Sequence, residues 1–211
     1  MLVSKLQYIT QGATPKEHLL HVQKACVSGA DWVQLRLKNL SEKKVLKIAK
    51  EAREITAHFQ TRLIINDYYM VAAEVKADGV HLGKTDTCPT IARKELAPWQ
   101  IIGGTSNTIE DCEQLIKKEV DYIGLGPYQF TKTKENLSSV LGKNGYLTII
   151  EQLKTDIPII AIGGITTQNA SELMDTGIYG IAVSGEITRD FNTISKFNKI
   201  VKGPSLDEKV W

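Results

Sequence analysis

The sequence predicts a single (β/α)8 TIM barrel, an α/β fold in which eight parallel strands close into a barrel inside a ring of helices. Three observations support this fold class. The 211 residues fit one domain of this kind, which spans about 200 to 250 residues. Short apolar runs recur along the chain, and segments of helical periodicity lie between them. The runs lack a polar face, which is typical of strands buried on both sides in a parallel sheet.

Eight strands are predicted in order, each followed by a helix or a helical turn. They span residues 6–10, 32–35, 63–66, 79–82, 101–105, 122–125, 158–162 and 180–183. A doubly wound open sheet is the alternative, but it seldom holds eight such units in so few residues. We expect the barrel to occupy residues 1–202 as one domain and residues 203–211 to form a C-terminal tail.

The helices between these strands begin at residues that favour N-caps. Thr14 precedes a proline, and this pair suits an N-cap and the first helical position. Ser41 opens a second helix, and Thr108 with an acid three residues later resembles a capping box. Residues 166–169 are expected to open a further helix that closes at Gly177.

Composition and charge exclude several classes of function. The formal charge of +2, from 26 basic and 24 acidic residues, gives no overall attraction to nucleic acid. The three cysteines form no C-x-x-C pair, so neither a zinc site nor a disulfide framework is indicated. No apolar stretch reaches the ~18 residues of a membrane span, and the N-terminus does not resemble a signal peptide. We expect a soluble cytoplasmic protein that binds small molecules and neither nucleic acid nor a membrane; a homo-oligomer is compatible with the sequence.

Polar residues follow the second strand at alternating positions. Gln34, Arg36 and Lys38 project the same way, because side chains alternate along a strand. Inward-facing cations are costly in an apolar barrel unless an anion meets them. The alternative is that Arg36 and Lys38 form internal ion pairs with acids on neighbouring strands, and the residues alone leave both interpretations open.

Acidic residues follow the next two strands. Asn66 and Asp67 end one strand, and Asp86 lies just past the following strand. Two carboxylates on neighbouring loops, with a diphosphate supplying further oxygens, are typical of an Mg²⁺ site. The alternative for Asn66 and Asp67 is a turn and N-cap for a helix that starts near Tyr68.

Glycine-rich and hydroxyl-bearing turns follow the last two strands. Gly163 and Gly164 follow the seventh strand, and Ser184 and Gly185 follow the eighth. Many barrels bind a phosphate there, through backbone N–H groups and the N-terminus of a short helix. Ordinary strand-to-helix turns explain one such site easily and two consecutive sites less well.

A long loop follows the sixth strand, from Pro127 to about Gly145. Loops of this length in a compact domain are usually lids or binding loops. Its Thr131, Thr133 and Lys134 could close over a phosphorylated substrate, although a solvated basic loop is the alternative.

The histidines do not mark a catalytic base. His81 lies within a strand, where we expect a buried, hydrogen-bonded side chain. His18, His21 and His58 fall on predicted outer helices and carry no functional signal.

Taken together, these motifs resemble the thiamine-phosphate synthase family over nearly the whole chain and in the family's order. The most diagnostic motifs are Gln34-Leu35-Arg36-x-Lys38, Ile65-Asn66-Asp67, Asp78-Gly79-Val80-His81-Leu82-Gly83 with Asp86, and Gly124-Leu125-Gly126-Pro127 with Thr131-x-Thr133-Lys134. The resemblance implies that a pyrimidine diphosphate condenses with a thiazole phosphate to give thiamine phosphate and pyrophosphate, with Mg²⁺ as cofactor.

The resemblance also implies a role for each site residue. The pyrimidine diphosphate would be held by Gln34, Arg36, Lys38, Asn66 and Lys134, with Ser106 against the pyrimidine. Mg²⁺ would be bound by Asp67 and Asp86. The thiazole phosphate would be placed by Thr131, Thr133, Gly164, Ser184 and Gly185. Arg36, Lys38 and Lys134 would be catalytic, because positive charge stabilises the departing pyrophosphate.

Several positions depart from the family pattern. Leu37 stands where an acid is usual, Lys84 replaces a common glutamine, and Asn107 stands near a typical histidine. Ser184-Gly185-Glu186 also differs from the usual small, apolar ending of the eighth strand. Two other functions therefore stay open: a thiazole tautomerase, which is a related barrel, and a non-catalytic barrel that binds thiamine precursors. A tautomerase would need a general base near position 107, and asparagine cannot serve as one.

Overall fold

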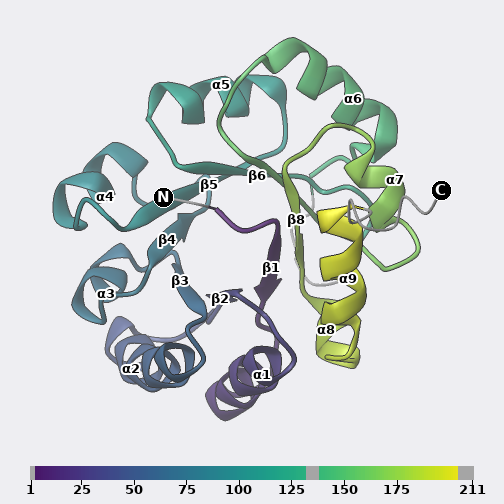
Figure 1. Cartoon of the computed structure of the whole chain (residues 1–211). Helices are drawn as coiled ribbons and strands as arrows, with labels where there is room; N and C mark the ends of the chain where they lie inside the picture. The colour runs from purple at the N-terminus through teal and green to yellow at the C-terminus, as the bar shows by residue number, and fades with distance from the viewer. Residues whose placement is uncertain (1–2, 132–137, 204–211) are drawn as a thin grey trace.

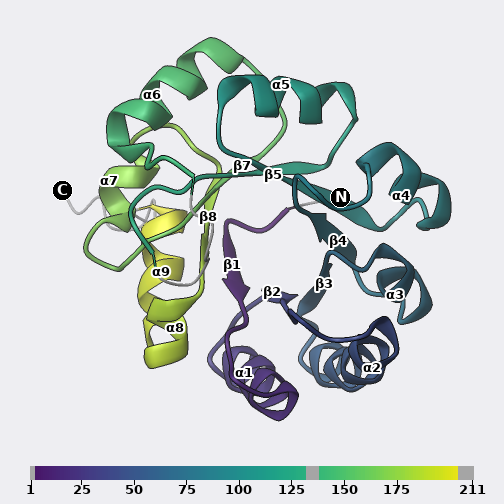
Figure 2. The same ribbon diagram turned by 180° about the vertical axis from the view of Figure 1, so that it is seen from behind.

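The computed structural model describes residues 3–131 and 138–203 and confirms the predicted TIM barrel (Figures 1 and 2). Eight parallel strands pair in sequence order, and β8 pairs with β1 to close the barrel. The strands are β1 (Leu6–Ile9), β2 (Trp32–Leu35), β3 (Arg62–Asn66), β4 (Gly79–Leu82), β5 (Ile101–Ser106), β6 (Tyr122–Leu125), β7 (Ile159–Ile162) and β8 (Gly180–Val183). All eight therefore lie where the apolar runs predicted them.

Helices surround the barrel and cover its outer face, as Figure 1 shows. The described helices are α1 (Pro15–Val27), α2 (Glu42–His58), α3 (Tyr69–Glu74), α4 (Pro89–Glu95), α5 (Ile109–Lys117), α6 (Gly142–Leu153), α7 (Ala170–Met174), α8 (Gly185–Arg189) and α9 (Thr193–Lys202). Thr14 caps α1 by accepting from the Glu17 N–H, and Thr108 forms a complete capping box with Asp111 at α5. None of the described helices is long and apolar enough to cross a membrane.

One helical prediction needed correction. The helix expected to open at residues 166–169 begins only at Ala170, because the Asn169 side chain accepts from the Thr166 N–H and holds those residues in a turn. The eighth unit carries a short α8 directly after β8, before the longer α9. Such an extra short helix is a frequent feature of barrels that bind phosphate.

The core has two layers. A large layer of apolar side chains lies between strands and helices. A smaller layer fills the barrel interior, where Trp32, Ile64 and Tyr122 are fully buried. Polar interior side chains, such as Asn66 and His81, come from positions nearer the C-terminal ends of the strands.

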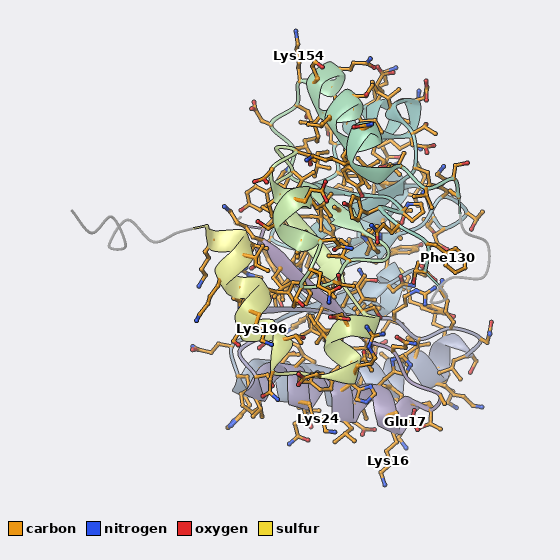
Figure 3. All side chains as sticks on the ribbon, turned by 90° about the vertical axis from the view of Figure 1, so that its right-hand side faces the viewer. Lys16, Glu17, Lys24, Phe130, Lys154 and Lys196 are labelled. Carbon is orange, nitrogen blue, oxygen red and sulfur yellow. The ribbon has the colours of Figure 1, made fainter. Side chains whose placement is uncertain are left out.

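In Figure 3, Phe130 of the loop after β6 projects on the opposite side of the molecule from α9.

Candidate active site

An aspartate pair lies where the loops after β3 and β4 meet. The Gly83 N–H donates to Asp86 Oδ2 at 2.6 Å, and a Cβ atom on Gly83 would lie 2.8 Å from that oxygen. Glycine therefore allows the carboxylate to fold back over the loop. Asp86 in turn shares a hydrogen bond with Asp67. Burial, and then this hydrogen bond, raises the pKa of Asp67 to about 6.

The backbone conformation directs the Asp67 side chain toward Asp86 and not toward the N-terminus of α3. The alternative for Asn66 and Asp67 was a turn and an N-cap: the turn is present, since the Tyr69 N–H donates to the Asp67 carbonyl at 3.0 Å, but the N-cap of α3 is Tyr68, without a side-chain cap. Asp67 has a φ of 66°, a left-handed conformation that is uncommon outside glycine. Such strain clusters at functional sites, where the surrounding structure enforces it.

The pair fits a hard divalent cation whose remaining ligands come from elsewhere. The described residues hold no cluster of three or more histidine, cysteine or acidic side chains that could bind a metal alone. Two adjacent carboxylates nevertheless repel one another when both are ionised, and a cation between them would relieve that repulsion. Mg²⁺ is commonly bound by one or two carboxylates together with phosphate oxygens and water.

The two predicted cations on β2 and its exit behave differently. Lys38 is exposed and its ammonium pairs with Asp67, as the ion-pair alternative predicted. Arg36 is half-buried, and no described residue forms a hydrogen bond or ion pair with its guanidinium. Burial lowers the pKa of Arg36. A partly desolvated guanidinium without a partner is suited to receive an anion.

The Arg36 backbone is held by the Thr10 hydroxyl, which a histidine that the sequence did not single out holds in turn. The Arg36 N–H donates to Thr10 Oγ1 at 3.0 Å, and that hydroxyl lies 2.8 Å from His18 Nδ1. His18 Nε2 contacts the Gly12 carbonyl at 3.1 Å, so this nitrogen carries the proton and Nδ1 accepts from Thr10. Burial lowers the pKa of His18, which keeps the ring neutral and able to accept.

Two predicted substrate-binding residues carry buried polar atoms without partners. Among the described residues, such atoms are Asn66 Nδ2, Ser184 Oγ and the indole nitrogen of Trp32. Buried polar groups are nearly always hydrogen-bonded in folded proteins. Asn66 ends β3 and Ser184 follows β8, so both lie at strand C-terminal ends, where a ligand could satisfy them.

Gln34 and Ser106, which the resemblance assigns to the pyrimidine diphosphate, are both buried and hydrogen-bonded within the protein. Gln34 is buried and donates to Gln7 Oε1 at 3.1 Å. Ser106 is fully buried, and its hydroxyl lies 3.2 Å from Cys112 Sγ of α5, on the outer face of β5. The preceding residue, Thr105, faces the opposite way and lies 2.9 Å from His81 Nε2. The β5 hydroxyl brought to the barrel interior is therefore that of Thr105.

The loop after β6 meets the glycine turn after β7. Thr131 is half-buried in this loop, whereas Thr133 and Lys134 lie outside the described residues. Gly163 and Gly164 have φ values of 95° and 68°, and a Cβ on Gly164 would lie 2.8 Å from the Cβ of Gln129. Close approach of the loop is thus one reason for glycine at this turn.

Asn107, near the position where the resemblance leads one to expect a histidine, connects the loops after β5 and β6. Its side-chain amide donates to the Gly126 carbonyl, and its carbonyl oxygen accepts from the Ser138 hydroxyl at 2.9 Å. Both functional groups of this side chain are therefore engaged in holding the loop.

At the C-terminal mouth of the barrel, the exits of β2, β3, β4 and β8 present an acidic pair, a guanidinium without a partner among the described residues, and orphaned polar atoms. In TIM barrels this end carries the active site. The fold and this arrangement of groups define the class: a barrel enzyme with its candidate active site at the C-terminal mouth.

Comparisons with known proteins give the family. Residues 6–187 match the model of the thiamine monophosphate synthase family, and the chain belongs to this family. It is 47% identical over 204 residues to a thiamine-phosphate synthase of Flavobacterium psychrophilum, covering 94% of this chain and 99% of that protein. It is 38% identical to a thiamine-phosphate synthase of Bacteroides thetaiotaomicron, covering 93% and 95% respectively.

A solved structure agrees with this assignment. Thiamine phosphate pyrophosphorylase from Pyrococcus furiosus superimposes with a TM-score of 0.79 at 32% sequence identity, covering 94% of this chain and 95% of that chain. A structure described as native KDPGal, at 15% identity and a TM-score of 0.71, shares the fold alone.

Proposed function

We propose that this chain joins 4-amino-2-methyl-5-hydroxymethylpyrimidine diphosphate to 4-methyl-5-(2-phosphoethyl)thiazole, giving thiamine phosphate and pyrophosphate, as its family membership indicates. The observation that carries the site assignment is the Asp67–Asp86 pair beside Arg36. This arrangement supports a metal-bound diphosphate at the mouth of the barrel. Asp67 and Asp86 would hold the metal cation, and the Arg36 guanidinium would hold the anion.

The acidic pair is the proposed Mg²⁺ site. Asp67 and Asp86 would hold the cation, with diphosphate oxygens completing its ligands. When bound, Mg²⁺ would supply positive charge to the diphosphate and so make pyrophosphate a better leaving group. Lys38 pairs with Asp67 in the structure, so its ammonium lies beside the proposed metal site and would help to neutralise the diphosphate.

The proposed chemistry needs no protein nucleophile or strong base. The electron-rich aminopyrimidine stabilises the cation left when the CH₂–O bond breaks, so the residues act mainly on the departing pyrophosphate. Arg36, Lys38 and Lys134 are the proposed catalytic cations, because they place positive charge where negative charge develops. The orphaned Asn66 Nδ2 is suited to donate to a diphosphate oxygen.

The second substrate is proposed to bind across the loops after β6, β7 and β8. Ser184 and Gly185 lie at the start of α8, where the buried Ser184 hydroxyl is suited to donate to a phosphate oxygen. Gly164, Thr131 and Thr133 would complete the thiazole phosphate site. Anchoring this phosphate aims the thiazole nitrogen at the pyrimidine cation.

The contacts of Asn107 disfavour a tautomerase. Its amide and its carbonyl oxygen both hold the loop after β6, and an amide cannot act as a general base. A cytoplasmic location is also proposed, because Cys26, Cys88 and Cys112 are all free, as expected in a reducing compartment.

The decisive experiment is pyrophosphate release by the purified protein with both substrates and Mg²⁺. We expect release that requires the thiazole phosphate and that stops when EDTA is added. Omitting either substrate is the matched control. Release without the thiazole phosphate would indicate a diphosphatase, and no release under any condition would reject the synthase function.

A further inference from the structure

A chain of hydrogen bonds crosses the barrel interior beneath the proposed site. Gln34 Nε2 donates to Gln7 Oε1 at 3.1 Å, and Gln7 Nε2 lies 3.5 Å from the Tyr122 hydroxyl. Tyr122 lies 3.0 Å from His81 Nδ1, and His81 Nε2 lies 2.9 Å from Thr105 Oγ1. This chain of hydrogen bonds therefore links side chains from β1, β2, β4, β5 and β6, and its two ends are Gln34 and Thr105.

Two strand glycines make room for the central rings of this chain. A Cβ on Gly103 would lie 2.0 Å from the Tyr122 ring, and a Cβ on Gly124 would lie 3.0 Å from His81 Cε1. Trp32 packs edge-on against Tyr122, with ring centroids 5.0 Å apart. The backbone of β5 and β6 is thus shaped around the Tyr122–His81 pair, which fixes both rings.

The donor and acceptor roles of Tyr122, His81 and Thr105 give this chain of hydrogen bonds a direction. Burial raises the pKa of Tyr122, so the phenol keeps its proton. Because it accepts from Gln7 Nε2, it donates that proton to His81 Nδ1. A neutral imidazole that accepts at Nδ1 carries its own proton on Nε2 and donates it to Thr105 Oγ1.

The direction sets what each end offers to a ligand. The Thr105 hydroxyl accepts from His81, so its own proton is left to donate. At the other end, Gln34 uses its amide nitrogen on Gln7, and no described residue donates to its Oε1, which is left as an acceptor. Continuing the pairing of β4 with β5 places Thr105 beside Gly83, whose N–H holds Asp86.

We propose that Tyr122 and His81 are positioning residues that fix the Thr105 hydroxyl as a hydrogen-bond donor to a ring nitrogen of the pyrimidine substrate. This inference rests on the proposed function. A 4-aminopyrimidine carries both an amine, which donates, and ring nitrogens, which accept. One donor at Thr105 and one acceptor at Gln34 match that pattern and reject a ring with the opposite pattern.

The test measures binding in a double-mutant cycle. The dissociation constant of the pyrimidine diphosphate is measured by calorimetry with Mg²⁺ and without the thiazole phosphate, for wild type, Thr105→Val, Tyr122→Phe and the double variant. We expect each single substitution to weaken binding about tenfold, the value of one hydrogen bond to a ligand. The double variant should bind no more weakly than Thr105→Val alone, because Tyr122 acts only through that hydroxyl.

Two controls separate positioning from damage to the fold. Inorganic pyrophosphate lacks the ring, so its dissociation constant should be the same in all four proteins. Tyr146→Phe removes another buried tyrosine hydroxyl, which donates to the Leu125 carbonyl and takes no part in this series of hydrogen bonds. It should leave pyrimidine diphosphate binding unchanged. Where Tyr122→Phe fails to fold, His81→Leu and His81→Gln replace it: glutamine can still donate to Thr105 and should retain affinity that leucine loses.

Each result decides the proposal. Additive losses in the double variant, or equal weakening of pyrophosphate binding by Tyr122→Phe, would overturn it, and so would wild type that fails to bind the pyrimidine diphosphate. Coupled losses confined to the pyrimidine ligand would support it. Since binding is measured without turnover, absence of pyrophosphate release would reject the proposed reaction but would not affect the proposed positioning role of Tyr122 and His81.

Discussion

The two ends of the barrel use aspartate and arginine in opposite ways. At the N-terminal ends of the strands, Asp78 Oδ2 accepts from the Leu63 N–H at 2.8 Å and from the Arg53 guanidinium at 2.7 Å. Asp121 repeats this arrangement before β6, accepting from the Ile102 N–H and from Arg93. Each carboxylate there has both a backbone and a charged partner.

At the C-terminal ends the same residue types are left incompletely paired. Asp67 meets a second carboxylate, in a strained backbone conformation, and the Arg36 guanidinium has no partner among the described residues. The difference teaches which end carries function. We infer that Asp78 and Asp121, with both kinds of partner, serve stability, whereas Asp67 and Arg36 are left for ligands to satisfy.

The largest expected effect comes from removing one charge of the acidic pair. Asp86→Asn should lower Mg²⁺-dependent pyrophosphate release by about 10²–10³-fold, because a key electrostatic contribution to the transition state is lost. The fold should persist, since the asparagine oxygen can still accept from the Gly83 N–H. Steady-state rates and a thermal melt of the same preparation measure both effects.

The matched control is the same substitution at the opposite end. Asp121→Asn removes an equal charge but lies at the start of β6, so the rate per folded molecule should equal that of wild type. Equal losses of rate in both variants would mean that the two ends do not divide stability from function as we argue.

A smaller effect, on stability, is expected at the satisfied end. Asp78→Ala leaves the Arg53 guanidinium and the Leu63 N–H without their acceptor, and should lower the free energy of unfolding by about 2 kcal/mol. Urea denaturation at neutral pH measures this change.

An exposed ion pair serves as the comparison for that loss. Glu74→Ala breaks the pair with Lys50, whose two side chains are 53% and 56% exposed, and should change the free energy by less than about 0.5 kcal/mol. If both substitutions cost the same, the buried backbone partner of Asp78 contributes nothing measurable.

The strands, and with them the positions of the polar residues at their C-terminal ends, could be predicted because burial leaves a direct mark on sequence. Apolar runs marked all eight strands, and polar residues at or just past their C-terminal ends drew attention to Asn66, Asp67 and Asp86. The tail beyond α9 and the catalytic role of Lys134 remain predictions, since they lie outside the described residues.

Other features could not be read from the sequence, for physical reasons. Glycines at positions 103 and 104 carry no side chain, so β5 gave no alternation to show whether Thr105 or Ser106 faces inward. Tyr122 begins an apolar run and looked like ordinary core. Its hydroxyl gains a role only through His81 and Gln7, which are distant in sequence and meet on the closed sheet.

The smallest effect tests whether the mouth of the barrel sacrifices stability. Asp67 has a pKa of about 6 in the fold, raised from 3.8, so its contribution to stability is fully present below pH 3.8 and is lost as pH rises through 6. Asp67→Asn avoids that loss, and asparagine tolerates the left-handed backbone there. Without Mg²⁺, the variant should exceed wild type by about 1 kcal/mol above pH 7, with the advantage shrinking toward pH 4.

Urea denaturation of both proteins from pH 4 to pH 8 measures this difference, and adding Mg²⁺ supplies the control. A cation held by the carboxylates stabilises only the folded wild type, so it should narrow or reverse the advantage of the variant. An Asp67→Asn protein that is less stable than wild type at pH 7.5 without metal would show that the ion pair with Lys38 outweighs the repulsion from Asp86. In that case the acidic pair would be a satisfied structural element, like Asp78 and Asp121, and the contrast between the two ends would no longer hold.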